Sequence, residues 1–383
     1  MQLRNRFLQA LLVMFCMMGA VSAQSALNIT KQGNWGKGEG EIKAVFAAGP
    51  VTYYGVGNKV QITAFSDPAN PLKLASVDVP ELVEELVRTS ISSNQYLVVA
   101  NGENLSIINV QNPTSPSLVG NAALSSTAEG VATSGNYAYV AAGGAGLQIY
   151  DISNPANPTW VSAIDTLSWG EGVVISQPYC YMAHGGRTSI IDISNPAAPV
   201  LVSQIPSFSG GWNQDVNVRS GYAYICEYDF GIQVVNVTNP ASPSQANWVD
   251  TGNRTAFMVF DGNYGYVANG DSGLRVLDVS IPSSPVEVGI LPTSDRVQPS
   301  RALWWTIRPA VGSSAYASAV DGLQSNQAAV PPPPPVSRSS TVRHWSSKAS
   351  TAARFMPTAL AARASDCKAP IRVRRGQAAP AGY

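Results

Sequence analysis

The chain has little charge and few of the residues that build reactive sites. Only 13% of its 383 residues are charged and the formal net charge is zero, so a polyanion such as a nucleic acid has no electrostatic basis for binding. It has two histidines, and only His184 lies outside the C-terminal region. One histidine cannot build the usual metal site. We therefore expect no metal, no cofactor and no nucleic-acid partner.

Long apolar runs are missing beyond the N-terminus. Residues 1–23 have a basic start, an apolar run from Phe7 to Ala20, and small residues before Gln24. This pattern predicts a secretory signal peptide cleaved after Ala23. The run is too short for a retained membrane anchor. We expect a secreted protein with no membrane span in the mature chain, located outside the cell, at its surface or in the periplasm.

Cysteines are scarce, and three of the four follow the predicted cleavage site. Cys180 and Cys226 lie on corresponding strands of neighbouring repeats, at the second position of YCYMA and the fifth of YAYIC. Because side chains alternate between faces along a strand, these two point to opposite sides. We predict that they form no disulfide and act as small buried apolar residues.

Prolines, by contrast, are regularly placed. Pairs of prolines three residues apart follow a β-branched strand that ends in a short polar turn, at 68/71, 113/116, 155/158, 196/199, 240/243 and 282/285. The first prolines are 45, 42, 41, 44 and 42 residues apart, which matches the period of roughly 40 to 45 residues of a four-stranded propeller blade. We predict an all-β chain, a β-propeller of about six readable blades or a truncated seven- or eight-bladed ring, with a disordered C-terminal tail.

The residue before each proline turn has a predicted local role. Proline lacks a donor and presets φ, so a segment such as NPANP ends one strand and turns the chain into the next. A side-chain oxygen just before the turn can accept its free amides, and the candidates are Asp151, Asp192, Asp278, Asn109 and Asn236. A calcium site is the alternative, but one carboxylate per repeat suits a local cap.

The run LQIYDISNPANP, with SIIDISNPAAP and RVLDVSIPSSP, resembles the LVIVD-repeat family of secreted and surface β-propellers. The resemblance covers about residues 41 to 292. It implies an extracytoplasmic propeller, and it transfers no catalytic residues because the family is mostly without an assigned activity.

The expected organisation is a signal peptide at 1–23, a linker at 24–40, the propeller at 41–292 and a tail at 293–383. The tail is rich in Pro, Ala, Ser and Arg, and it holds half of the chain's 24 lysines and arginines. One interpretation is a disordered basic tail. The other is a segment read out of frame, because the codons of Met356–Ala359 read one base earlier can encode a sequence close to YVANG at 266–270. With either interpretation, we expect no blade strand from this tail.

Blade geometry predicts a candidate binding face. In this strand order, the loop between the second and third strands and the loop entering the first strand open on the same end of the ring. Two tryptophans beside carboxylates and an arginine suit a sugar, a peptide or a partner loop; the alternative is that both indoles cover the core. The candidate binding residues are Trp169, Glu171, His184, Arg187, Trp212, Gln214, Tyr228, Asp229, Arg254 and Asp271.

Two other features are interpreted as structural. Tyrosine pairs recur at one register, at 137/139, 179/181, 222/224 and 264/266, which favours packing between blades over a ligand site. GDSG at 270–273 lies in a hairpin loop and lacks the histidine and aspartate partners of a serine protease. His184 is expected to be solvated or bonded within its turn.

These patterns favour a non-enzymatic scaffold that binds an unknown protein or glycan. We expect it to be a monomer. No nucleophile, base or metal constellation stands out. The alternative is a hydrolase or lyase that acts on extracellular polysaccharide with Glu171 or Asp229 beside the tryptophans.

Overall fold

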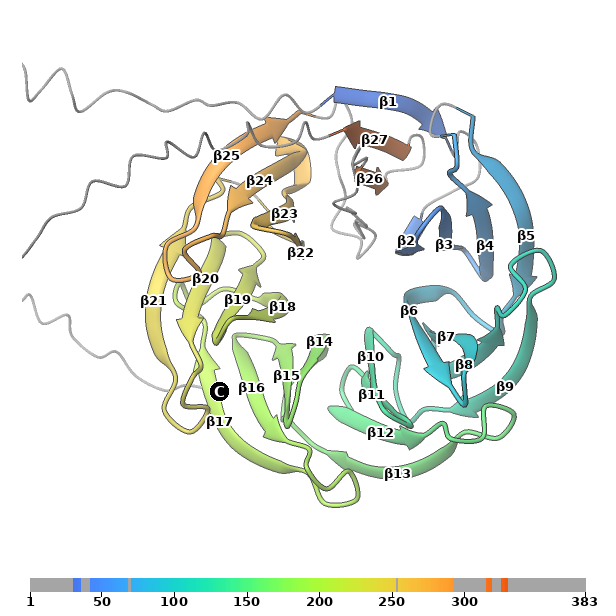
Figure 1. The fold of residues 1–383 in the computed structure, drawn as a ribbon. Helices are drawn as coiled ribbons and strands as arrows, with labels where there is room; N and C mark the ends of the chain where they lie inside the picture. Colours follow the sequence, from blue (N-terminus) through green and yellow to red (C-terminus); the bar gives the residue numbers. More distant parts are fainter. Residues whose placement is uncertain are drawn as a thin grey trace, which may run out of the picture. The chain divides into compact units, whose positions relative to one another are not determined.

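The computed structural model describes residues 30–35, 42–67, 70–252, 254–292, 315–318 and 325–329. All of them belong to the first of the chain's two structural units, Met1–Pro333. Six four-stranded antiparallel sheets form the blades of a propeller ring (Figure 1), as predicted. The only helix among the described residues is the short 3-10 turn η1 (Gly270–Ser272), and no described helix could cross a membrane. The predicted signal peptide lies outside the described residues.

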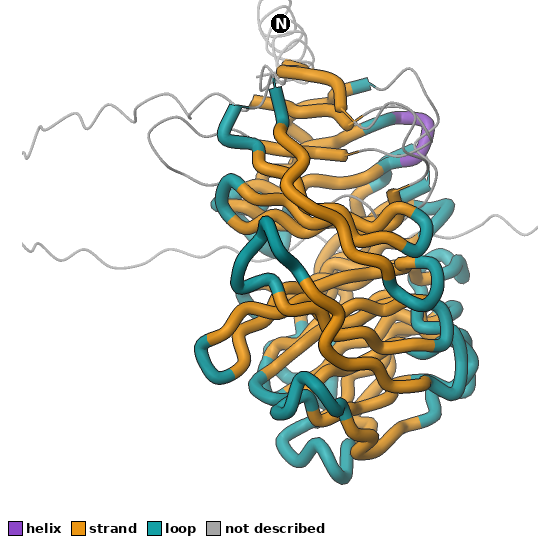
Figure 2. The backbone as a smooth tube through the Cα atoms, turned by 90° about the vertical axis from the view of Figure 1, so that its right-hand side faces the viewer, coloured by secondary structure: helices purple, strands orange, loops and turns teal. Residues whose placement is uncertain are grey.

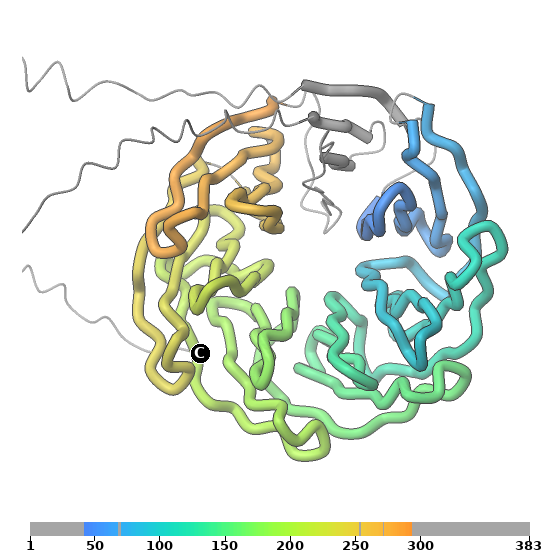
Figure 3. Tube along the Cα trace, in the orientation of Figure 1, coloured from blue at the N-terminus to red at the C-terminus, as the bar shows by residue number. Residues whose placement is uncertain are grey.

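Each blade runs in chain order from its innermost to its outermost strand, and the blades follow one another around the ring (Figure 3). Blades 1 and 2 comprise β2 (Ile42–Ala48), β3 (Val51–Val56), β4 (Lys59–Ala64), β5 (Leu72–Asp78), β6 (Val83–Ile91), β7 (Asn94–Asn101), β8 (Asn104–Asn109) and β9 (Ser117–Ala123). Blades 3 and 4 comprise β10 (Gly130–Ser134), β11 (Tyr137–Ala141), β12 (Leu147–Asp151), β13 (Thr159–Ile164), β14 (Gly170–Ser176), β15 (Tyr179–His184), β16 (Arg187–Asp192) and β17 (Val200–Pro206). Blades 5 and 6 comprise β18 (Asn213–Arg219), β19 (Tyr222–Glu227), β20 (Gly231–Asn236), β21 (Ser244–Val249), β22 (Phe257–Asp261), β23 (Tyr264–Ala268), β24 (Leu274–Asp278) and β25 (Val286–Leu291).

The proline turns between third and fourth strands carry the predicted caps. In five blades, the last side chain of the third strand accepts a hydrogen bond from the backbone N–H two residues later, at 2.7 to 2.9 Å. The pairs are Asn109–Gln111, Asp151–Ser153, Asp192–Ser194, Asn236–Thr238 and Asp278–Ser280. The prediction of a local cap is confirmed. In each of these turns, a short polar side chain accepts a hydrogen bond from a backbone amide that the strand ladder leaves free.

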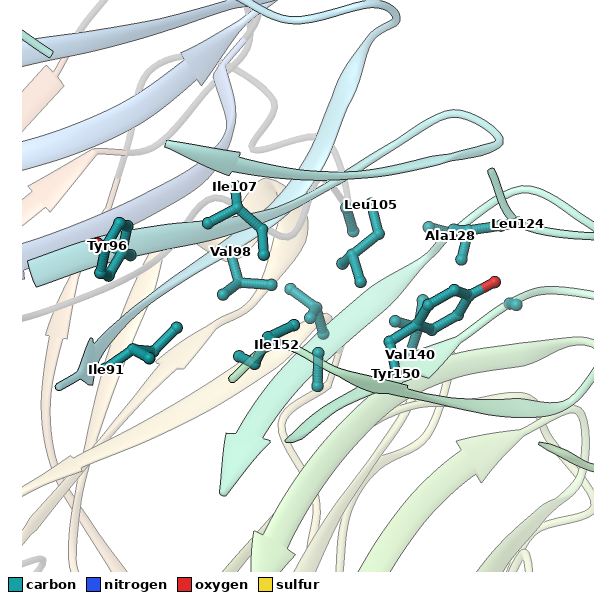
Figure 4. Close-up of a cluster of buried hydrophobic side chains, with 14 residues drawn as sticks. Ile91, Tyr96, Val98, Leu105, Ile107, Leu124, Ala128, Val140, Tyr150 and Ile152 are labelled. Atoms are coloured by element: carbon teal, nitrogen blue, oxygen red, sulfur yellow. The ribbon is translucent and has the colours of Figure 1, made fainter. Parts of the chain in front are cut away.

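The core lies between neighbouring blades. Figure 4 shows the cluster shared by blades 2 and 3, in which Tyr96, Ile107 and Val140 are among the buried side chains. The second tyrosine of each repeated pair is also buried, at positions 139, 181, 224 and 266. This confirms that the tyrosine register serves packing between blades, and burial raises the pKa of Tyr224 to about 12.

The two described cysteines are buried, free and held in different clusters. Cys180 packs with Tyr139 and Ile149 between blades 3 and 4, whereas Cys226 packs with Met258 between blades 5 and 6. Burial raises the pKa of both thiols, which keeps them protonated and unreactive. The prediction that they point to opposite sides is confirmed.

A seventh sheet has three strands and was not expected. β1 (Thr30–Trp35) pairs antiparallel with β27 (Ser325–Ala329), which pairs with β26 (Ala315–Ser318). β1 falls in the segment expected to be a linker, and the other two fall in the region expected to provide no strand. That expectation is wrong. The three strands could not be recognised from the sequence because they lack the recurrent proline turn of the other blades.

Candidate functional site

Two sets of loops meet at one end of the ring, which we call the channel-mouth face. It comprises the hairpins between second and third strands and the loops that enter the first strands. Seen from the side, the connecting loops gather at the two ends of the strands (Figure 2). At five successive blade junctions, a hairpin carbonyl accepts a hydrogen bond of 2.5 to 2.9 Å from the N–H that opens the next blade. The acceptor and donor residues are Gly57 and Val83, Gly102 and Ala128, Gly143 and Gly170, Gly185 and Asn213, and Tyr228 and Thr255. The prediction that both sets share one end is confirmed.

Trp169 and Trp212 occupy equivalent places on this face. Each residue immediately precedes the first strand of its blade, β14 and β18 respectively, and they are 40% and 43% exposed. The Trp169 ring lies against Gly143, where an added Cβ would come within 2.9 Å of Cζ2. A side chain at Gly143 would therefore displace the indole. Both indoles thus keep substantial exposed area instead of being sealed in the core.

Glu171 links the two tryptophan positions. It lies on β14, two residues after Trp169, and its Oε1 accepts a hydrogen bond of 3.2 Å from Nε1 of Trp212. The bond fixes the edge of the Trp212 indole and places a carboxylate beside it. Two of the predicted site residues, Glu171 and Trp212, are therefore joined across the junction of blades 4 and 5.

Glu227 shapes the loop that carries Trp212. This carboxylate is fully buried at the end of β19. It accepts hydrogen bonds from Ser207 Oγ at 2.7 Å, from the amides of Phe208 at 2.7 Å and Ser209 at 3.3 Å, and from Ser209 Oγ. Phe208 then projects outward and stacks on Trp248, with ring centroids 5.2 Å apart. Glu227 is a positioning residue for the loop, and it does not itself reach the surface.

The hairpin of blade 5 adds an aromatic and charged group. The guanidinium of Arg254 lies over the ring of Tyr228, 4.7 Å from its centroid, and Nε is 3.9 Å from Asp229 Oδ1. Phe230 is exposed and its ring lies against Gly211, where an added Cβ would approach within 2.5 Å. The predicted residues Tyr228, Asp229 and Arg254 are therefore neighbours.

His184 does not lie on the face. It ends β15 with 1% of its surface exposed, and Nε2 lies 2.7 Å from Ser189 Oγ. Burial, followed by the nearby Arg187 charge, lowers the pKa of His184 to about 4, so the ring is neutral near pH 7. Its inclusion among the surface binding residues is corrected. The sequence placed His184 in the hairpin loop, whereas β15 includes this residue and its ring is buried.

The remaining predicted residues lie at the margin of the face. Arg187 opens β16 and donates from Nη1 to Gln204 Oε1 at 3.1 Å, so its guanidinium is held on its own blade. Gln214 is a half-buried residue of β18. Asp271 lies in η1 at the same end of the ring. Neither Arg187 nor Gln214 contacts the tryptophan pair through a hydrogen bond seen in the described residues.

Leu167 and Phe208 are exposed apolar side chains of this face that sequence reasoning did not include. Leu167 is 90% exposed in the loop that enters blade 4, with φ of 58° and its N–H bonded to Asp165 Oδ1 at 2.7 Å. Phe208 is exposed in the loop that enters blade 5. The sequences of these two loops do not recur in the other blades, so alignment of the repeats could not predict that these side chains are exposed. A positive φ at leucine is a strained conformation, and strain of this kind concentrates at functional sites.

The described residues include no group of three or more His, Cys, Asp or Glu side chains able to hold a metal ion. Buried carboxylates on the first strands accept backbone hydrogen bonds from the next blade: Glu85 from the Val131 N–H at 2.6 Å and Asp215 from the Met258 N–H at 3.5 Å. These two carboxylates therefore bridge neighbouring blades.

Comparison with solved structures supports the fold alone. Sqt1 of Saccharomyces cerevisiae is similar at a TM-score of 0.59 with 8% identity, covering 78% of this chain and 99% of that one. A functionally unknown protein from Desulfotomaculum acetoxidans DSM 771 is similar at 0.59 with 15% identity, covering 69% and 87%. A chain of the mitotic checkpoint complex is similar at 0.62 with 12% identity, covering 79% and 93%. No curated protein sequence matches the chain.

The LVIVD repeat model matches five segments, residues 90–123, 126–166, 170–205, 210–251 and 258–293. These segments correspond to blades 2 to 6, each taken from near its first strand to its fourth. With five matched repeats in the ring described above, the chain belongs to the LVIVD-repeat family.

Proposed function

We propose that this propeller is a secreted, non-enzymatic scaffold that binds a ligand on its channel-mouth face. The observation that carries the proposal is the exposure of Trp169 and Trp212 at equivalent places, with the Glu171 carboxylate bonded to Trp212. Repeated tyrosines elsewhere in the ring are buried. Exposed tryptophans at the centre of a face carry a large share of binding energy in known interfaces.

Three further observations support the same face. Leu167, Phe208 and Phe230 add exposed apolar side chains to the loops of blades 4 and 5, and gathered exposed apolar surface marks interaction sites. The loops that carry them are fixed by side-chain and backbone hydrogen bonds, so little ordering is needed on binding. The basic and apolar N-terminus supports export, because it has the form of a signal peptide.

The mature protein beginning at Gln24 provides the test. Binding is measured on arrays of glycans and of peptides, and hydrolysis or lyase turnover is measured on the same polysaccharides. We expect binding without turnover, and we expect Trp169→Ala and Trp212→Ala to weaken it. Trp160→Ala is the matched control, since Trp160 is exposed on the outermost strand of blade 3.

Two outcomes would contradict the proposal. Turnover that Glu171→Gln abolishes would show an enzyme that uses this carboxylate. Ligand binding that responds to Trp160→Ala and to neither channel-mouth variant would place the site on the outer strands. Export is tested separately, by N-terminal sequencing of the protein recovered outside the cytoplasm, where we expect Gln24 as the first residue.

A further inference from the structure

The neutral chain contains a strongly acidic propeller. Residues 42–292 hold 19 aspartates and glutamates against 8 lysines and arginines, a net charge of −11. The balancing positive charge lies outside this range. A summed charge of this size creates a potential around the ring that attracts cations and repels anions.

Among loop residues, the acidic ones are concentrated at the channel-mouth face. Its hairpins and entering loops contain seven acidic residues and one basic residue, Arg254. The loops at the opposite end of the ring contain one acidic residue, Asp67, and no basic residue. The capping carboxylates Asp151, Asp192 and Asp278 also lie at that end, but as strand-end residues that bond to their own turns. The acidic residues of the channel-mouth loops are Glu81, Glu103, Glu129, Asp165, Asp229, Asp250 and Asp271.

The exposed apolar side chains follow the same asymmetry. Among large apolar residues in loops, six are exposed at the channel-mouth face and one, Ile281, at the opposite end. The six are Leu82, Leu167, Trp169, Phe208, Trp212 and Phe230. Five of these belong to blades 4 and 5, whose channel-mouth loops also carry Asp165 and Asp229.

We propose that the partner is a basic protein segment, whose arginine or lysine side chains lie over the Trp169 and Trp212 rings and pair with the surrounding carboxylates. This inference rests on the proposed function and adds the chemistry of the ligand. Cations are attracted to the faces of exposed indoles, and acidic loops speed the encounter with a basic partner. Glu171 supplies a carboxylate held against the Trp212 edge.

The ring already contains one example of this contact. Arg254 lies over the face of Tyr228 with Asp229 beside it, on the same end of the ring as the tryptophans. A guanidinium between an aromatic face and a carboxylate is therefore compatible with the geometry of these loops. An incoming arginine over Trp212, with Glu171 beside it, would repeat the arrangement across the neighbouring junction.

The test uses the mature chain and two short synthetic peptides, one of alternating arginine and glycine and one with glutamate in place of arginine. We expect the basic peptide alone to bind, and we expect its affinity to fall as NaCl rises from about 0.05 to about 0.5 M. Trp169→Ala and Trp212→Ala should each weaken it about tenfold or more. Glu171→Gln should weaken it about threefold to tenfold.

Two control variants separate a site from general attraction. Trp160→Ala removes an exposed indole from the outer surface. Asp151→Asn removes a charge at the opposite end while keeping the turn cap, because Asn109 and Asn236 make the same cap in other blades. We expect neither control to change the affinity for the basic peptide by more than about twofold.

The outcomes separate this inference from the proposed function. If the basic peptide fails to bind while an uncharged glycan binds in a tryptophan-dependent way, the ligand inference is overturned and the binding face stands. If the basic peptide binds equally to all five variants, the attraction is unspecific and the inference is overturned. If no peptide or glycan depends on Trp169 or Trp212, both the ligand and the face are overturned.

Discussion

Nε1 of Trp212 donates a hydrogen bond of 3.2 Å to Oε1 of Glu171, which joins the loop entering blade 5 to the first strand of blade 4. The bond orients the indole of a residue that is 43% exposed. It therefore ties the edge of the indole to the neighbouring blade, and the proposed function requires that the exposed part of the side chain contact the ligand.

Trp169→Ala and Trp212→Ala should leave the melting temperature within a few degrees of wild type, because exposed side chains contribute little to stability. Each should weaken ligand binding by about 2 kcal/mol, as central aromatic contacts do. Calorimetry and titration on the same samples measure both quantities, with Trp160→Ala as the control. A melting temperature lowered by many degrees would identify the indoles as core.

Tyr224→Ala should lower the free energy of unfolding by roughly 3 to 5 kcal/mol, the usual cost of emptying a buried aromatic site. The ring is fully buried, lies 4.9 Å from the Phe260 centroid, and donates a hydrogen bond of 2.7 Å to the Pro282 carbonyl. Denaturant unfolding measures the loss. Tyr224→Phe, which removes only the hydroxyl, should cost about 1 kcal/mol, and a loss below about 1 kcal/mol for the alanine variant would mean that the site is not buried.

Leu167→Gly should leave stability unchanged or raise it by up to about 1 kcal/mol, because glycine accepts φ of 58° without strain. It should also weaken ligand binding, since the exposed side chain is removed. Leu167→Ala is the matched control, because it removes the same contact while retaining the strained backbone. Equal affinity of wild type and both variants for the ligand would show that the Leu167 side chain does not contact it.

His184 should make stability fall in acid. Its pKa is lowered from 6.5 to about 4 in the folded protein, so the unfolded chain binds a proton first as the pH decreases. Its neutral form contributes fully above pH 6.5, and up to about 3 kcal/mol is lost between pH 6.5 and 4. His184→Asn should remove this component, because Asn101 and Asn269 occupy the same place in other blades. Parallel pH profiles for both proteins would contradict the prediction.

Asp151→Ala should cost about 1 kcal/mol, because the Ser153 N–H loses its acceptor in the proline turn. Asp151→Asn should be nearly neutral, since asparagine caps the same turn after β8 and β20. Thermal unfolding of the two variants gives the comparison. A calcium-dependent difference between them would favour a metal at Asp151 over the local cap.

The repeat could be predicted because each blade uses the same local chemistry at the same position. The prolines and the capping residue, such as Asp151, act within a few residues of one another, so their consequences are visible in the sequence. The face to which each strand residue points could also be predicted, because the alternation of side chains along a strand places Cys180 and Cys226 on opposite faces. β26 and β27 could not be found in this way, because they lack the recurrent turn.

The candidate site was predicted only in part, because its loops do not repeat. The equivalence of Trp169 and Trp212 follows from their register, and the structure places both on the expected end of the ring. The outward course of Leu167 depends on one backbone angle and that of Phe208 on a bond to Glu227. The inward turn of His184 depends on how far β15 extends.

The five hydrogen bonds that join successive blades at the channel-mouth face have a consequence for how this surface can diversify. Donor and acceptor are both main-chain atoms, so the bonds do not depend on the chemical identity of the flanking side chains. If the face binds a ligand as proposed, substitutions at residues such as Trp169, Trp212 or Phe208 can then alter what it recognises while the junctions that hold neighbouring blades together persist. A lineage could acquire new ligands at this end of the ring through point mutations, without first evolving a compensating change in the scaffold.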